Sequence, residues 1–172
     1  MISDDYLAEQ TRLHESPKYG VASVLFAPLV AQLIRDNRIA TLHDYGAGKR
    51  RLCEELERLG VTVTYSASDP VFPEYGAAQS ADLVCCIDVL EHIEPDHLDA
   101  VLNDLQRITT KAGFYTIHTD PALKTLSDGR NAHLIQKPSS WWLPRLCERF
   151  EVVHLQSIKH GFWVVVTAKT PA

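Results

Sequence analysis

Large apolar side chains recur along this chain at two spacings, and each spacing predicts a different kind of element. Where they recur every three or four residues they predict helices, which we place at residues 21–36, 50–59, 95–110 and 139–149. Continuous apolar or β-branched runs predict strands, which we place from Leu42, at 61–65, from Asp82, at 114–118, at 151–158 and at 162–168. Strands that alternate with helices predict an α/β fold, and the last two strands predict a closing antiparallel hairpin.

Composition and charge narrow the class of protein. With 172 residues, of which 45% are hydrophobic, we expect one domain over residues 1–172 with a substantial core. The formal charge of −5 speaks against general binding of nucleic acid, although it allows recognition of an RNA end. The chain begins with polar and acidic residues and contains no apolar run of membrane-spanning length, so we expect a soluble cytoplasmic protein that does not bind membranes. Its four cysteines form no C-x-x-C pair, which favours reduced, structural thiols.

A glycine-containing turn follows the first predicted strand. This turn, Asp44-Tyr45-Gly46-Ala47-Gly48, leads directly into a predicted helix, and residues without a Cβ atom let the backbone approach a ligand there. Two nucleotide-binding fingerprints fail at the same place. The dinucleotide motif requires glycine where Arg51 stands, and the phosphate-binding loop requires glycine at His43 and a hydroxyl at Arg50. We call these five residues the glycine turn.

Two further stretches strengthen the expectation of a nucleotide-like ligand. Asp69 follows the second predicted strand, about 20 positions beyond the glycine turn, where an acidic side chain can bind ribose hydroxyls. The predicted strand from Asp82 then runs into the polar sequence Asp88-Val89-Leu90-Glu91-His92-Ile93.

With these three stretches, residues 40–168 resemble the class I S-adenosylmethionine-dependent methyltransferases. The resemblance implies a Rossmann-like methyltransferase sheet, methyl transfer, and S-adenosyl-L-methionine as cofactor. It implies that the glycine turn, through Asp44, Gly46 and Gly48, holds the methionine end, that Asp69 binds the ribose, and that the turn at Asp88 and Val89 lies beside the sulfonium.

In such methyltransferases the segment before the first strand folds over the cofactor. We therefore expect residues 1–38 to form a helical segment that covers the cofactor, with Tyr19 in reach of it, and residues 39–172 to form the core. The alternative is that Tyr19 only packs against the domain.

The chain departs from the family pattern after the second predicted strand. Only twelve residues, from Pro70 to Ala81, separate Asp69 from the next predicted strand, and prolines and a glycine among them indicate a loop. The second helix and third strand of the family therefore look missing, which leaves six strands and places the strand at 61–65 at an edge. We infer that Pro70, Val71 and Phe72 cover the adenine instead.

The polar sequence after Asp82 also resembles two groups of metal-using methyltransferases. One group methylates the 2′-hydroxyl at RNA 3′ ends, with a Glu-x-x-Glu-His motif and a later histidine, and the other comprises O-methyltransferases of ubiquinone biosynthesis. Glu91, His92 and His133 match the RNA group, whereas Asp88 replaces its first glutamate. The resemblance implies a Mg²⁺ or Mn²⁺ site at Asp88, Glu91, His92 and His133, and His92, His133 and Glu91 as catalytic residues. The alternative is that Glu91 and His92 support the turn without a metal.

A long polar connection, residues 119–140, is interpreted as the substrate loop. His118, Arg130 and Asn131 are expected to form hydrogen bonds with the substrate. Trp141 and Trp142, at the start of a helix capped by a preceding serine, are expected either to form an aromatic wall for the substrate or to belong to the core or its rim.

Two hypotheses of function follow. The favoured one is an S-adenosylmethionine-dependent methyltransferase that O-methylates a hydroxyl of a small molecule, sugar or nucleotide terminus. The alternative is a non-catalytic or regulatory binding domain that retains the methyltransferase fold. The fold does not choose the acceptor, because one scaffold hosts many substrates.

Overall fold

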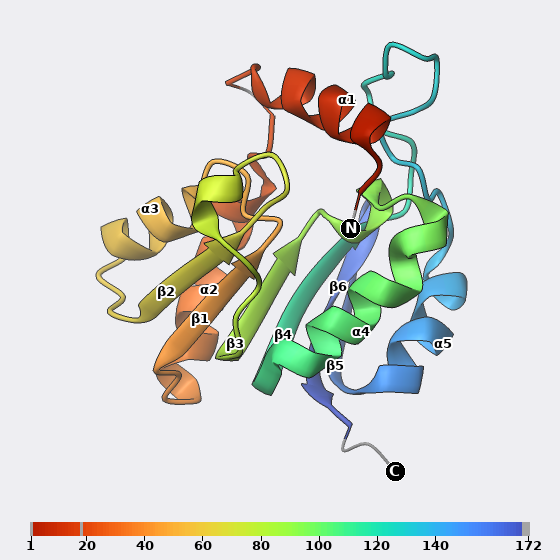
Figure 1. Ribbon diagram of the computed structural model, residues 1–172. Coiled ribbons are helices and arrows are strands. Elements are labelled where there is room, and N and C mark those ends of the chain that lie inside the picture. Colours follow the sequence, from red (N-terminus) through yellow and green to blue (C-terminus); the bar gives the residue numbers. More distant parts are fainter. Residues whose placement is uncertain (1, 18, 170–172) are drawn as a thin grey trace.

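A six-stranded sheet runs through the centre of the molecule in the order β2-β1-β3-β4-β6-β5 (Figure 1). The computed structural model describes residues 2–17 and 19–169. The strands are β1 (Thr41–Tyr45), β2 (Thr64–Ser68), β3 (Ala81–Ile87), β4 (Thr109–His118), β5 (Phe150–Ile158) and β6 (Gly161–Ala168). The first four pair in parallel, and β6 pairs antiparallel with both β4 and β5. This arrangement confirms the predicted Rossmann-like sheet with a closing hairpin.

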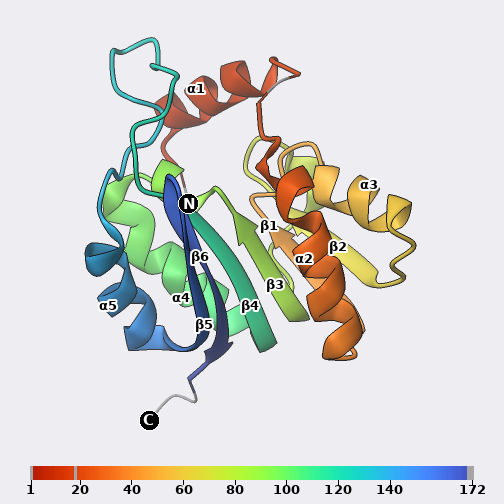
Figure 2. The ribbon, with the colours of Figure 1, turned by 180° about the vertical axis from the view of Figure 1, so that it is seen from behind.

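Helices cover both faces of the sheet (Figure 2). On one face lie α2 (Ala22–Asp36) and α3 (Arg51–Arg58), and on the other lie α4 (Leu98–Ile108) and α5 (Ser139–Arg149). Each pair of helices buries apolar side chains against its own face, so the core has two halves. Cys85 and Cys86, adjacent on β3, are free thiols that point into opposite halves, as alternation along a strand requires. None of the helices within the described residues has the length and apolarity that crossing a membrane would require.

The connection between β2 and β3 contains a single short 3-10 helix, η1 (Pro73–Tyr75). No further helix or paired strand lies between Asp69 and Ala81, all of which the structure describes. The predicted loss of one helix and one strand is therefore confirmed, and β2 lies at an edge of the sheet.

Several boundaries differ from their predictions. The strand expected at 61–65 begins at Thr64, where its pairing with β1 starts, and Val61 and Val63 pack against the core ahead of it. The helix expected over 95–110 begins as a 3-10 turn, η3 (Pro95–His97), and ends at Ile108, after which β4 starts directly. The expected serine cap of α5 is wrong: Pro138 occupies the cap position, and no side chain caps the helix.

The N-terminal residues form α1 (Asp4–His14), which lies across the carboxyl ends of the parallel strands (Figure 1). Ser3 caps the helix, and its backbone N–H and hydroxyl donate to the Glu94 carboxylate at 2.8 and 2.7 Å. The backbone N–H of Ser127 donates to Glu9 at 3.0 Å, and its hydroxyl donates to the same carboxylate. These bonds hold α1 over the place where ligands bind in open α/β sheets.

Candidate functional site

A cavity of about 810 Å³ opens beneath α1, at the carboxyl ends of the strands. The glycine turn, the start of the loop after β2 and the turn after β3 form its inner wall. Residues of α1, the start of α2 and the connection after β4 form its outer wall. Nearly all the predicted cofactor residues line this cavity: Tyr19, Asp44, Gly46, Gly48, Asp69, Pro70, Asp88 and Val89.

The glycine turn requires both of its glycines. Gly46 and Gly48 have φ values of +73° and +49°, in the left-handed region that L side chains rarely adopt. A Cβ atom at Gly46 would lie 2.6 Å from Cγ2 of Val89, and one at Gly48 would lie 3.0 Å from Cε1 of His14. The backbone N–H of Gly46 donates to the Ser68 carbonyl at 2.8 Å, which ties the turn to the end of β2. The turn therefore brings bare backbone to the cavity wall.

Asp44 lies almost fully buried at the base of the glycine turn. Its Oδ2 accepts a hydrogen bond from the Tyr65 hydroxyl at 2.6 Å, because the parallel register of β1 and β2 brings these neighbouring side chains together. Burial raises the pKa of Asp44 to about 7, and the bond from Tyr65 acts in the opposite direction. This carboxyl can therefore change its protonation state near neutral pH.

Asp69 joins the glycine turn to the start of the loop after β2. Its carboxylate accepts the backbone N–H of Gly48 and that of Val71, both at 2.8 Å. Pro70 and Val71 line the cavity as expected. The expectation for Phe72 is wrong, because its ring turns away from the cavity wall, stacks on Tyr75 at 5.3 Å and meets the edge of His14.

Three of the four predicted metal ligands converge. Glu91, His92 and His133 each offer a ligand atom, and these atoms lie within 4.8 Å of one another. Glu91 and His92 lie in the 3-10 turn after β3, whereas His133 comes from the connection after β4. The predicted convergence of these residues on one place is confirmed. We call them the Glu-His-His cluster.

The hydrogen bonds of the cluster leave its ligand atoms available. Nδ1 of His92 lies 2.8 Å from the Ala132 carbonyl, and Nδ1 of His133 lies 2.7 Å from the Asp120 carbonyl. Since a carbonyl only accepts, each Nδ1 carries the proton, which leaves Nε2 as a lone-pair donor. Oε1 of Glu91 accepts the backbone N–H of His118 at 2.8 Å, while Oε2 is buried and has no hydrogen-bond partner among the described residues. A buried oxygen without a partner is costly unless a ligand completes it.

Burial dominates the electrostatics of the cluster. It raises the pKa of Glu91 well above its ordinary value, with the nearby Asp88 adding to the effect. It lowers the pKa of His92 to about 3, and it lowers the pKa of His133 as well. Both imidazoles are therefore neutral at physiological pH, which is the state that binds cations.

Asp88 does not join the cluster, so its assignment as a metal ligand is corrected. Its Oδ1 accepts the Thr116 hydroxyl at 2.7 Å, and its backbone N–H donates to the same hydroxyl oxygen at 2.9 Å. The residue has a φ of +52°, a strained value that these two bonds stabilise. Thr116 thus fixes Asp88 on the cavity wall but holds its shorter side chain away from the Glu-His-His cluster.

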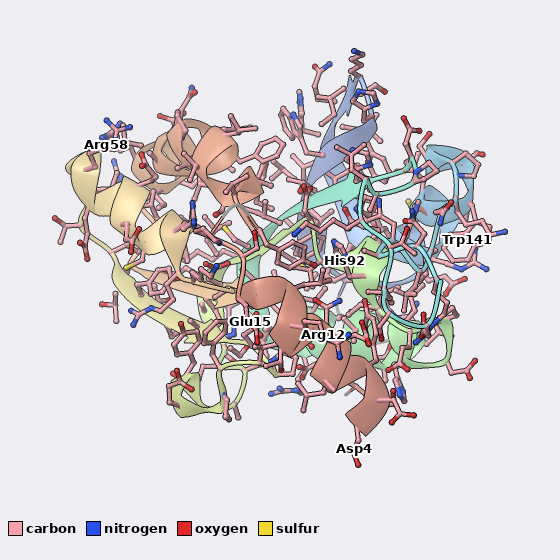
Figure 3. The ribbon with its side chains drawn as sticks, turned by 90° about the horizontal axis from the view of Figure 1, so that it is seen from above. Asp4, Arg12, Glu15, Arg58, His92 and Trp141 are labelled. Atoms are coloured by element: carbon pink, nitrogen blue, oxygen red, sulfur yellow. The ribbon has the colours of Figure 1, made fainter. Side chains whose placement is uncertain are left out.

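The predicted aromatic wall is wrong for both tryptophans. Trp142 has no exposed surface. It points from α5 into the core between this helix and the sheet, which is the alternative that the sequence left open. Trp141 lies at the periphery, far from His92, where Arg145 packs over its ring at 3.6 Å (Figure 3). It lines a separate, smaller cavity of about 230 Å³.

The other predicted substrate residues lie outside the main cavity, where they contact neighbouring side chains and backbone. The Asn131 amide donates to the Ala122 carbonyl and accepts its N–H, both at 2.9 Å, so it braces the connection after β4. Arg130 pairs with Asp128 and lies over the Tyr6 ring. His118 stacks on His160 and lies 4.9 Å from His133, ring centroid to centroid. None of the three lines the main cavity.

Several residues of the cavity wall were not singled out in the sequence, and four of them carry polar or charged side chains that matter for the site. Tyr6 and Gln10 face the cavity from α1, where their side chains are joined by a hydrogen bond of 2.6 Å. Lys124 comes from the connection after β4 and Asp104 from α4. The spacing of Tyr6 and Gln10, four residues apart, was the one local signal that both lie on the same face of a helix.

Comparison with known proteins supports a single family. A family model described as a methyltransferase domain matches residues 21–163. A search of curated proteins by sequence gave no significant match.

Solved structures share the fold at low sequence identity. An O-methyltransferase family protein from Burkholderia thailandensis superposes with a TM-score of 0.68 at 15% identity, over 99% of this chain and 64% of that one. The 1,6-didemethyltoxoflavin-N1-methyltransferase of the same organism, with bound 1,6-didemethyltoxoflavin and S-adenosylhomocysteine, gives 0.66 at 16% identity, over 96% and 90%. Magnesium protoporphyrin IX methyltransferase from Synechocystis PCC 6803, with bound SAM, gives 0.59 at 14%, over 96% and 92%. The chain thus spans just under two thirds of the first of these proteins.

Proposed function

The chain belongs to the methyltransferase-domain family, with the Rossmann-like fold of class I methyltransferases, and we propose that it transfers a methyl group from S-adenosylmethionine to a hydroxyl of a small-molecule, sugar or nucleotide acceptor. The observation that carries the proposal is one cavity whose wall contains the glycine turn, Asp69 and the two histidines of the Glu-His-His cluster. Structural neighbours with bound S-adenosylmethionine or its demethylated product support the choice of methyl donor.

The inner wall of the cavity fits the donor. Asp44 and the bare backbone at Gly46 would hold the ammonium and carboxylate of the methionine end. Asp69 would accept the ribose hydroxyls, and Pro70 and Val71 would cover the adenine. Tyr19 would close the cavity from above, where its hydroxyl is already held by Gln10 at 3.2 Å.

The Glu-His-His cluster fits a divalent cation. One Glu91 oxygen without a partner and two neutral imidazoles with free Nε2 atoms make a donor set of mixed oxygen and nitrogen. Burial raises the pKa of Glu91, and a bound cation would offset this effect by displacing the proton of the carboxyl. The carbonyls that accept hydrogen bonds from the two Nδ1–H groups fix the ring orientations, as the partners of metal-binding histidines usually do. Glu91, His92 and His133 would hold Mg²⁺ or Mn²⁺, which when bound would lower the pKa of an acceptor hydroxyl.

The reaction itself is an in-line displacement. The acceptor oxygen forms a bond to the methyl carbon, the carbon–sulfur bond breaks, its electron pair stays on sulfur, and the hydroxyl proton passes to solvent water. The chain therefore has to align the two reactants and exclude water, and α1 contributes by roofing the cavity. Asp88 and Val89, at the end of β3, would lie beside the sulfonium and fix its direction.

Transfer of tritium from methyl-labelled S-adenosylmethionine tests this proposal. The protein is incubated with Mn²⁺ and a panel of vicinal diols that includes catechols, sugars and an RNA 3′ end. Labelled product is expected from at least one acceptor, with loss of about 10-fold or more in rate for His133→Ala and on chelation of the metal. Binding of the donor without any transfer would support the non-catalytic alternative. Turnover that survives chelation would exclude a role for the cation and would favour an imidazole as the general base.

A further inference from the structure

Lys124 is the one lysine or arginine among the described residues that line the main cavity. It is half-buried, and its Nζ lies 5.1 Å from the centroid of the Tyr19 ring. No ion pair within the described part of the chain includes it. A lysine that faces a cavity without a carboxylate partner is available to an anion from outside the chain.

The connection after β4 holds Lys124 beside the Glu-His-His cluster. The backbone carbonyl of Lys124 accepts the N–H of Ala132 at 2.9 Å, next to His133 in the chain. A bridge between Thr125 and Asn131 continues this pairing, so the segment is a short, tied hairpin. The Tyr19 ring, over which the ammonium lies, is itself 6.2 Å from the ring of His92. These contacts place the ammonium within reach of a single-ring molecule whose hydroxyl lies at the cluster.

Charge is distributed unevenly over the cavity wall. The aspartates of the wall, Asp44, Asp69, Asp88 and Asp104, come from the strand ends and from α4. Beside Lys124 the wall carries the Tyr19 ring, and hydrogen bonds join Tyr19 through Gln10 to Tyr6, all of them uncharged polar side chains. Two carboxylates at the ends of this region are engaged elsewhere, Glu9 with Ser127 and Asp128 with Arg130, whereas Glu91 and Asp69 act on the Tyr19 hydroxyl from the strand side. Lys124 is therefore the one permanently cationic side chain that the described part of this wall offers to an anionic group.

We propose that Lys124 determines acceptor specificity by binding an anionic group, so that the acceptor is a hydroxylated small molecule that carries a carboxylate or phosphate. This inference rests on the proposed methyl transfer and names the acceptor class of the same site. The hydroxyl lies at the Glu-His-His cluster, and the anionic group lies at the Lys124 ammonium, near the Tyr19 face. A lysine ammonium binds carboxylate and phosphate as a point charge and so accepts either.

Three catechols of similar size and different charge test the proposal. Dihydroxybenzoate, dihydroxybenzyl alcohol and dihydroxybenzylamine, each with adjacent ring hydroxyls, are titrated calorimetrically into protein saturated with S-adenosylhomocysteine and Mg²⁺. The benzoate is expected to bind roughly 10-fold to 100-fold more tightly than the alcohol, the range of a charge-assisted hydrogen bond. Lys124→Met should remove this preference, and Lys124→Glu should shift it to the amine. Lys159→Met, which removes a lysine from the exposed turn between β5 and β6, should leave it unchanged.

The outcomes separate this proposal from the proposed function. Equal affinities for the three compounds, a preference that survives Lys124→Met, or no binding of any of them at millimolar concentration would each overturn the role of Lys124. Methyl transfer to some other acceptor would then still stand. Failure of S-adenosylhomocysteine itself to bind would overturn the proposed function instead. Retained affinity for S-adenosylhomocysteine in Lys124→Met shows that the variant is folded.

Discussion

Affinity for S-adenosylhomocysteine is expected to depend on the ionisation of Asp44. The side chain is 3% exposed and lines the cavity where the ammonium of the ligand would lie. Because burial raises the pKa of Asp44 to about 7, the carboxyl is mostly protonated at pH 6 and mostly ionised at pH 8 in the free protein. Only the ionised form attracts the ammonium, so binding must displace a proton at the lower pH.

The size of the effect follows from the fraction ionised. With a pKa of about 7, that fraction is roughly one tenth at pH 6 and roughly nine tenths at pH 8, so the affinity should rise about 10-fold across this range. The sign is opposite to that of a histidine that must be protonated. The imidazoles of the cavity do not interfere strongly, because burial lowers the pKa values of His14, His92 and His133 below 6.5.

Isothermal titration at several pH values, in buffers of different ionisation enthalpy, measures both the affinity and the protons released. Asp44→Asn should bind more weakly than the wild type at pH 8 and show a nearly flat profile. Tyr65→Phe removes the donor at 2.6 Å that lowers the pKa of Asp44, so the midpoint should move to higher pH while the shape of the curve persists. A wild-type affinity that is constant or falls between pH 6 and pH 8 would refute the assignment of Asp44 to the ammonium.

Three other substitutions probe the donor wall and the core. Gly46→Ala should weaken calorimetric binding of S-adenosylhomocysteine by about 10-fold or more, because φ is +73° and the added Cβ would lie 2.6 Å from Val89. The control Gly60→Ala, with a φ of +67° and open space around the added Cβ, should change the affinity little. Equal effects of the two substitutions would contradict the close approach of the backbone at Gly46. Asp69→Ala should cost on the order of 1–3 kcal/mol of binding free energy by titration, and Asp69→Asn less; an unchanged affinity would exclude a ribose contact. Trp142→Ala should lower the free energy of unfolding, measured by urea denaturation, by about 3–5 kcal/mol, because the side chain has no exposed surface. A loss under about 1 kcal/mol would contradict the placement of Trp142 in the core.

The sequence predicted the parts of the site that depend on local chemistry. Gly46 and Gly48 were recognisable because they stand between a strand and a helix and because Asp69 and the sequence from Asp88 to Ile93 follow them in order. The missing helix and strand followed from the length and composition of the segment, since twelve residues with two prolines and a glycine cannot hold both. Glu91, His92 and His133 met as expected because the carboxyl ends of adjacent parallel strands, β3 and β4, share one edge of the sheet.

What the sequence could not predict depends on tertiary packing. The partnership of Asp44 with Tyr65 depends on the register of β1 and β2, which no local pattern specifies. Trp142 looked equally suited to a wall or a core, and only the packing of α5 against the sheet decides between them. Lys124 stands in a connection without periodicity, so only its pairing with Ala132 brings it to the cavity.

A crystal structure with S-adenosylhomocysteine and Mn²⁺ tests the central proposal most directly, because the anomalous signal of manganese locates the cation independently of the ligand. The account predicts S-adenosylhomocysteine along the glycine turn, with its ribose at Asp69, and an anomalous peak bound by Glu91, His92 and His133. A crystal structure in which no S-adenosylhomocysteine occupies the main cavity would contradict binding of the methyl donor. Bound ligand with no peak at the Glu-His-His cluster would contradict the cation that we propose for methyl transfer.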